Sequence, residues 1–116
     1  MLEDTTRLDL LQGTLDLMVL RTLLALGPQH GYGLARRIEQ TSGDRILLNQ
    51  GTIYAALLRL QQRGLISAAW GKSENCRRAK YYVLTARGRK RIERETAVWN
   101  RLAAVMERFL KLAPEN

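Results

Sequence analysis

The chain has 116 residues, enough for one compact domain with one appended element, and its single cysteine excludes an intramolecular disulfide or a multi-cysteine metal site. Its net charge is +8, and residues 59–116 carry fourteen Lys and Arg against five Asp and Glu, whereas residues 1–58 carry five against six. A basic half of this kind is typical of a protein that binds a polyanion, although a merely soluble surface is the alternative. The most apolar stretch, 15–26, is too short for a bilayer span and follows no basic segment, so we expect a cytoplasmic protein.

The first predicted element is a helix that follows an N-terminal arm over residues 1–13. Thr14 is a suitable N-cap, and apolar residues then recur at helical spacing until Gly27-Pro28 ends the pattern. The segment His30-Gly31-Tyr32-Gly33 predicts a tight turn into a second helix over residues 34–41. Both helices are expected to bury one face in a common core.

A third helix is predicted over residues 50–62, with Asn49 as its N-cap and Gly64 just beyond its C-terminus. Its inward face is apolar at helical spacing, with Ile53, Ala56, Leu57 and Leu60. Its outward face is rich in hydrogen-bonding groups, with Gln50, Thr52, Tyr54 and Arg59 among them. The helix is therefore expected to pack on the core and to present a polar face outward.

After Gly64 the apolar pattern changes from helical to strand-like. We predict two strands, over residues 65–70 and 79–84, joined as a hairpin that we call the wing. Because a lone hairpin is only marginally stable in water, the wing must pack on the helices. Four cations lie near its turn: Lys72, Arg77, Arg78 and Lys80.

Thr85 is the expected N-cap of a final helix that extends to about residue 112, before a tail over 113–116. At 1.5 Å per residue this helix is about 40 Å long, which is more than the small domain needs for its own core. Its apolar residues recur at nearly heptad spacing, as in helices that pair with another copy. The predicted dimerisation residues are Ile92, Trp99, Leu102, Met106, Phe109 and Leu110.

This order of elements predicts a mainly α fold with a small β-hairpin (α+β): a winged helix-turn-helix domain over 14–86 and a dimerisation helix over 87–112. In such a domain the third helix enters the major groove of duplex DNA, and the wing approaches phosphates or the minor groove. The expected DNA-binding residues are Gln50, Thr52, Tyr54, Arg59, Lys72, Arg77, Arg78 and Lys80. The alternatives are a helix and loop that are only solvated, and a dimeric protein-interaction adaptor that does not bind DNA.

Several motifs together resemble the PadR family of transcriptional regulators over about residues 11–110. They are Leu11-Gln12-Gly13-Thr14-Leu15, His30-Gly31-Tyr32-Gly33, Gln50-Gly51-Thr52-Ile53-Tyr54, Leu57 through Arg59-Leu60 to Gly64-Leu65-Ile66, and Ala79-Lys80-Tyr81-Tyr82 with Leu84-Thr85 and Gly88. The single helix after the wing is similar to the compact subgroup of that family. Where many members have Gly-Arg-Pro-Arg-Lys, this chain reads Cys76-Arg77-Arg78-Ala79-Lys80, which keeps the charge but lacks the Gly and the Pro that set the backbone path of the wing in those members.

The resemblance implies a winged-helix homodimer, usually a repressor, whose C-terminal helices pair across a two-fold axis and whose third helix and wing contact operator DNA. Two symmetric recognition helices predict a pseudo-palindromic operator with half-sites about 34 Å apart. Because some relatives respond to phenolic acids or planar drugs, Trp99 and Met106 are candidates for a pocket that holds a small aromatic effector. Core packing between paired helices is the simpler role for both residues.

The inventory of reactive side chains does not favour an enzyme, since there is one His, one Cys and no phosphate-loop pattern. His30 has no companion histidine, and neither a metal nor another cofactor is expected. Cys76 lies beside Arg77 and Arg78, whose charge favours the thiolate, but a spectator cysteine is the simpler interpretation.

Overall fold

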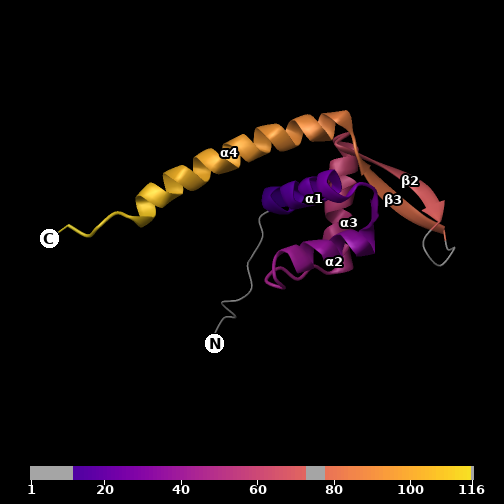
Figure 1. Cartoon of the computed structure of the whole chain (residues 1–116), viewed down its shortest axis with the longest axis horizontal. Coiled ribbons are helices and arrows are strands. Elements are labelled where there is room, and N and C mark those ends of the chain that lie inside the picture. The colour runs from indigo at the N-terminus through magenta and orange to yellow at the C-terminus, as the bar shows by residue number, and fades with distance from the viewer. Residues whose placement is uncertain (1–11, 73–77, 116) are drawn as a thin grey trace.

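The computed structural model describes residues 12–72 and 78–115, which form four α-helices and a small sheet (Figure 1). In chain order the elements are α1 (Gln12–Leu26), β1 (Gln29–His30), α2 (Gly31–Thr41), α3 (Gln50–Gln62), β2 (Ile66–Lys72), β3 (Arg78–Leu84) and α4 (Ala86–Leu110). Helices α1, α2 and α3 form a compact body, β2 and β3 project from one end of it, and α4 extends away on its own (Figure 1). The predicted mainly helical fold with a small β-hairpin is confirmed.

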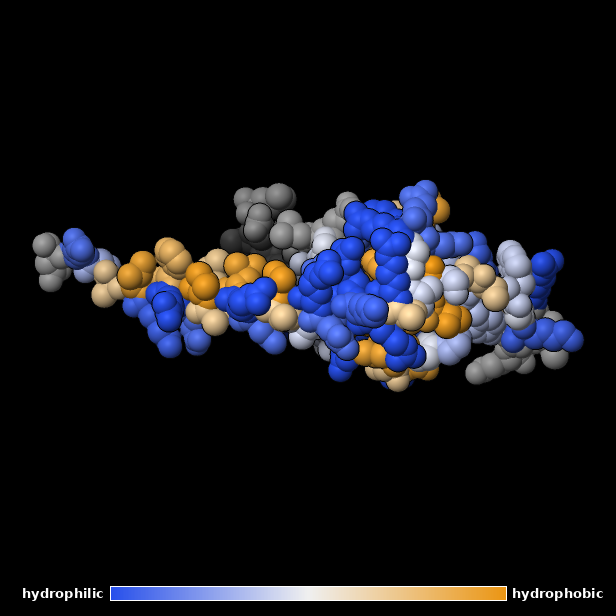
Figure 2. Space-filling view, turned by 90° about the horizontal axis from the view of Figure 1, so that it is seen from above, coloured by the Kyte–Doolittle hydropathy of each residue, from blue (hydrophilic) through white to orange (hydrophobic). Residues whose placement is uncertain are grey.

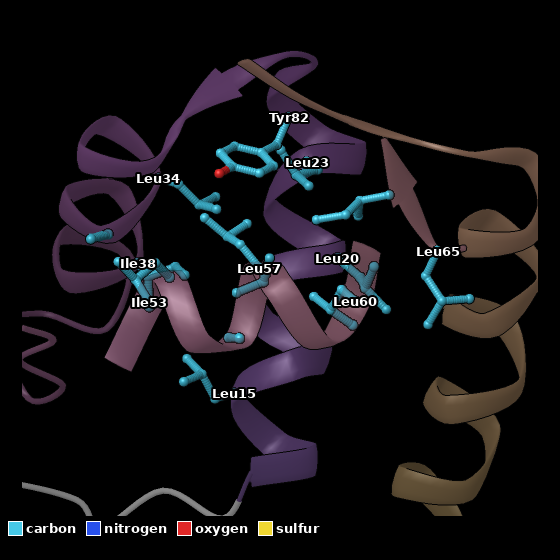
Figure 3. Packing of buried hydrophobic residues seen from close by; sticks show 14 of the residues in the cluster. Leu15, Leu20, Leu23, Leu34, Ile38, Ile53, Leu57, Leu60, Leu65 and Tyr82 are labelled. Carbon is cyan, nitrogen blue, oxygen red and sulfur yellow. The ribbon is translucent and has the colours of Figure 1, made fainter. Parts of the chain in front are cut away.

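The core lies between the first three helices and the inner part of the sheet (Figure 3). Each helix contributes side chains that are almost completely buried, such as Val19 of α1, Leu34 of α2 and Ile53 of α3. The inward face predicted for the third helix is confirmed: all four of its apolar residues are buried. Tyr82 of β3 closes the core from the side of the wing (Figure 3).

Two helices begin earlier than the sequence pattern indicates. Helix α1 begins at Gln12, so Thr14 lies inside the helix and is not its N-cap. Helix α2 begins at Gly31, because the side chain of His30 serves as the N-cap: its Nδ1 accepts a hydrogen bond from the Gly33 N–H at 2.9 Å. The predicted turn over residues 30–33 is therefore the cap and the first turn of the helix.

Helix α3 has the bounds predicted from its end signals. The Oδ1 atom of Asn49 accepts a hydrogen bond from the Thr52 N–H at 2.8 Å, which satisfies one of the free donors of the first turn. At the other end Gly64 has a φ of +74°, a left-handed conformation that glycine adopts without steric cost. Both signals are local, which is why the sequence alone was sufficient to place this helix.

The sheet has three strands in the order β1-β3-β2, all antiparallel. The wing pair was predicted, and its register joins Ile66 to Leu84 at the base and Lys72 to Arg78 near the tip. The third strand, β1, was not predicted, because two residues are too short to show an alternating pattern. Strand β1 attaches the turn before α2 to the wing and so couples the two.

Helix α4 begins at Ala86, and its N-cap is Thr85, as predicted: the Thr85 Oγ1 accepts a hydrogen bond from the Gly88 N–H at 3.0 Å. Its 25 residues correspond to a length of about 37 Å. Only its first turns pack on the domain, where Gly88 and Ile92 are buried. In the described part of the chain, no helix combines the length and hydrophobicity that a bilayer crossing requires.

Candidate nucleic-acid interface

The connection between α2 and α3 holds the two helices in a defined relation. The Ser42 hydroxyl donates to the Glu39 carbonyl oxygen at 2.8 Å and accepts from the Ile46 N–H at 3.0 Å. The Glu39 carboxylate accepts from the Leu48 N–H at 3.1 Å, and the Ile46 side chain is buried in the core. Because both polar and apolar groups anchor this segment, the N-terminus of α3 is held rigidly against α2.

The N-terminal half of α3 presents the predicted contact residues to solvent. Gln50 and Thr52 are exposed, and the Tyr54 side chain is 44 % exposed. Ala55 and Leu58 are exposed further along the helix. This surface combines hydrogen-bonding groups with small apolar ones, which are the groups that read base edges and thymine methyls in a major groove.

Arg59, which the sequence predicts to contact DNA, is paired with a side chain of its own domain. Its Nη2 atom donates to Oδ1 of Asp16 at 2.8 Å, and the side chain of Asp16 is only 9 % exposed. Arg59 therefore points back toward α1, where the pair joins α3 to α1 and neutralises the buried carboxylate. The sequence did not show this pairing because the two residues are 43 positions apart and on different helices.

Tyr54 is held in place by its neighbours as well as being exposed. A Cβ atom added to Gly31 would lie 2.7 Å from the Tyr54 Cζ, so the phenol ring rests on the N-terminus of α2 at a position where only glycine leaves room. Burial raises the pKa of the Tyr82 phenol, and the nearby Tyr54 phenol adds to the rise. The orientation of Tyr54 therefore depends on how its ring packs against the N-terminus of α2.

The described part of the wing carries three of its four predicted cations on one face. Lys72, Arg78 and Lys80 are all exposed, and the register places their side chains on the same side of the hairpin. The fourth, Arg77, lies outside the described residues, as does Cys76. The sequence reasoning missed Trp70, which shares this face; the guanidinium carbon of Arg78 lies 4.6 Å from the centroid of its ring.

The distal part of α4 exposes a broad apolar stripe. Figure 2 shows hydrophobic residues gathered along one side of this part of the helix and hydrophilic residues along the other. The large exposed side chains are Val98, Trp99, Leu102, Val105, Met106, Phe109 and Leu110, which are 46–78 % exposed. Ile92 does not belong to this stripe, contrary to the prediction: it is 4 % exposed and packs in the core of its own chain.

A largely apolar groove of about 450 Å³ lies where α4 passes α1 and α2. Its walls include Leu17 and Met18 of α1, Ile38 of α2 and Trp99 of α4. Met106, which was predicted to share a pocket with Trp99, is not among the lining residues. Within residues 12–72 and 78–115, no three His, Cys, Asp or Glu side chains gather as a metal ion would require.

Three helices, a wing of antiparallel strands and a cationic wing face together define a winged helix-turn-helix protein. Residues 19–94 match the model of the transcriptional regulator PadR-like family, so the chain belongs to this family of DNA-binding transcription regulators. The fold is similar to that of a transcriptional regulator from Clostridium thermocellum, with a TM-score of 0.78 and 26 % identity over 86 % of this chain and 96 % of the other.

One further solved structure and one further protein sequence are also similar to this chain. A PadR family transcription regulator from Clostridium difficile has a TM-score of 0.72 and 30 % identity, with coverage of 82 % of this chain and 96 % of that one. An uncharacterised 37.1 kDa protein of transposon TN4556 from Streptomyces fradiae is 38 % identical over 86 residues, which are 74 % of this chain and 23 % of that protein. The relatives that are described as regulators are transcription factors rather than enzymes.

The close packing of Tyr54 on Gly31 leads to a testable expectation. In Gly31→Ala the new methyl group displaces the Tyr54 ring, and we expect a loss of about 1–3 kcal/mol in the free energy of unfolding, as for other overpacked sites. Urea unfolding measures this loss. In a Tyr54→Ala background the same substitution should cost almost nothing, and an equal cost in both backgrounds would show that Tyr54 is not the obstacle.

Proposed function

We propose that the chain is a sequence-specific transcriptional repressor that binds a pseudo-palindromic operator as a homodimer. The observation that carries this proposal is the combination of two surfaces on one domain. The exposed face of α3 offers Gln50, Thr52 and Tyr54, and the adjoining wing face offers cations. The first surface suits base edges in the major groove, and the second suits the phosphates and the minor groove beside it.

The homodimer is proposed from the apolar surface of α4. A side chain such as Phe109, which is 64 % exposed, is costly to leave in water when several others lie beside it. The stripe leads toward the groove that Trp99 shares with α1 and α2, so a second copy of α4 could cover both surfaces. Two copies related by a two-fold axis would then place two α3 helices about 34 Å apart, the spacing of successive major grooves.

The repressor role, the lack of catalytic activity and the effector each need a separate test. The repressor role follows from the usual action of PadR-like regulators, and a reporter gene behind the chain's own promoter measures its sign. We also propose that the chain has no catalytic activity of its own. A small aromatic effector near Trp99 remains a prediction, for which a shift in DNA affinity on titration with planar aromatic compounds is the test.

The roles of α3 and the wing are separated by two variants. We expect the double variant Arg78→Ala with Lys80→Ala to weaken binding to every duplex. The slope of log affinity against log salt concentration should fall by about two, because two phosphate contacts are lost. Thr52→Ala should instead change which sequences are preferred. Fluorescence anisotropy with the duplex upstream of the chain's own gene and with a scrambled duplex, across a salt series, measures both effects.

The matched control for the charge change is Arg101→Ala with Arg108→Ala, which removes two exposed cations from the distal part of α4. This variant should keep nearly all of its affinity and its salt dependence. Equal losses in the two double variants would mean that net charge, rather than the wing, attracts DNA. A protein that dimerises but shifts no duplex would instead be the adaptor.

A further inference from the structure

The wing carries a large aromatic side chain that neither the core nor the recognition helix uses. Trp70 is 59 % exposed, and its indole lies beneath the guanidinium of Arg78, 4.6 Å from the Cζ atom to the ring centroid. Tryptophan is enriched at binding interfaces, because its large apolar ring also carries an N–H donor. The pair therefore requires an account beyond the packing of the hairpin.

The register of the hairpin shows which way the pair faces. Trp70 is directly opposite Lys80, and Arg78 is one step diagonally toward the tip, so the three side chains share one face. Toward the core the same face continues to Tyr82, whose ring lies 5.8 Å from the Lys80 Nζ. Tyr82 itself is buried in the core. The aromatic and cationic side chains thus form a strip that runs along one face of the hairpin from the core to the outer wing.

Within this strip, the indole of Trp70 restricts the orientation of the Arg78 guanidinium. The guanidinium carbon of Arg78 lies over the indole ring. A guanidinium that stacks on an aromatic ring can still donate hydrogen bonds from the N–H groups at its edge. An arginine that is already held in one orientation loses less conformational freedom when it binds. Lys72 and Lys80 supply charge without such rigidity, which suits phosphates, whereas an oriented arginine suits a narrow groove.

We propose that Trp70 is a positioning residue that holds Arg78 for insertion into the minor groove of A·T-rich DNA flanking the bases read by α3. The proposal rests on the proposed function, since it requires that the wing approach operator DNA. It adds a specificity that the major-groove contacts of α3 do not provide: a preference for narrow, strongly negative A·T minor grooves beside each half-site.

The test compares three duplexes that differ only in the pairs flanking each half-site: A·T, G·C and inosine·C. Inosine lacks the 2-amino group of guanine, so its pair with C resembles A·T in the minor groove and G·C in the major groove. We expect the unmodified protein to bind the G·C duplex about tenfold more weakly than the A·T duplex. Its affinity for the inosine·C duplex should equal its affinity for the A·T duplex.

The Trp70→Leu variant should bind all three duplexes with the affinity that the unmodified protein has for the G·C duplex. Its salt dependence should equal that of the unmodified protein, because no charge is removed. Trp70→Phe, which keeps an aromatic face for the guanidinium, should retain most of the discrimination. Val83→Ala, on the opposite face of β3, is the matched control and should discriminate like the unmodified protein. Thermal unfolding of each variant shows whether the wing is still folded.

Four results would overturn the proposal, and they can be told apart. Retained discrimination in Trp70→Leu would show that the indole does not position the reading group, and an inosine·C duplex that behaves like G·C would place the contact outside the minor groove. If the unmodified protein binds none of the duplexes, the proposed function fails first and the role of Trp70 falls with it. Binding without flank discrimination leaves the function standing and refutes this inference alone.

Discussion

Replacing Leu102 and Phe109 with glutamate together should convert the proposed homodimer to a monomer and weaken binding to an operator-length duplex by at least about a hundredfold. The side chains are 54 % and 64 % exposed and lie on the apolar side of α4, so the substitutions leave the core of the chain intact. In a dimer each glutamate would be buried against apolar side chains of the partner, where an unpaired charge is strongly unfavourable.

The loss of affinity follows from the loss of the second DNA-binding domain of the proposed dimer. When one half of a dimer is bound, the other half meets its half-site at a high effective concentration, and a monomer forfeits this advantage. Sedimentation equilibrium measures the mass, and fluorescence anisotropy with whole-operator and single half-site duplexes measures the affinity. The half-site affinity should change by much less than the whole-operator affinity.

The matched control places the same charge on the other side of the helix. Asn100→Glu with Ala104→Glu adds two carboxylates at exposed positions that lie away from the apolar stripe. This variant should remain a dimer and lose only the small affinity that two added negative charges cost. Dimers of Leu102→Glu with Phe109→Glu that still bind the whole operator would refute the proposed role of α4.

Gly88→Ala should be the most destabilising single change in the first turns of α4, with a loss of about 3 kcal/mol in the free energy of unfolding. A Cβ at this position would overlap the carbonyl oxygen of Leu65 and would lie 2.7 Å from the Leu84 Cδ1. The obstacle is partly backbone, and the Leu65 carbonyl also accepts a hydrogen bond from the Thr85 N–H at 3.1 Å. Helix α4 cannot move aside without disturbing this bond.

The measurement is urea unfolding at one fixed protein concentration, because the proposed dimer would make the apparent stability depend on concentration. Gly13→Ala is the matched control, since a Cβ there meets nothing within 4 Å and the residue lies in the first turn of α1. The same chemical change should leave stability unchanged or raise it slightly, as alanine favours helices over glycine. Equal stability of Gly88→Ala and the unmodified protein would mean that α4 does not cross the wing base as closely as described.

Some of the candidate site was predictable because its determinants are near neighbours in the chain. Asn49 and Gly64 mark the ends of α3, and the residues between them alternate between core and solvent at helical spacing. The exposure of Gln50, Thr52 and Tyr54 follows directly from that spacing. Cations gathered near a predicted hairpin turn are equally visible in the sequence, since strand alternation places Arg78 and Lys80 on one face.

Other parts of the site depend on contacts between distant segments. Trp70 and Arg78 belong to different strands, and only the register of the hairpin stacks them. The space that Gly31 leaves for Tyr54 depends on how α2 crosses α3, which no local pattern encodes. Heptad spacing placed Ile92 with the dimerisation residues, but the packing of α4 on the domain buries it.

The sequence by itself determined the order of the four helices and the two wing strands, the ends of α3 and the start of α4, and the two polar and cationic surfaces, because capping residues, glycines and apolar periodicity act within a few residues. Only the tertiary structure decided which cations are paired within the domain and which are exposed. Arg59 and Lys80 both read as surface cations in the chain, yet one is paired with the buried Asp16 and the other is exposed beside Trp70. Burial and charge pairing are properties of segments brought together by folding, so the availability of a side chain is decided there and not by its neighbours in sequence.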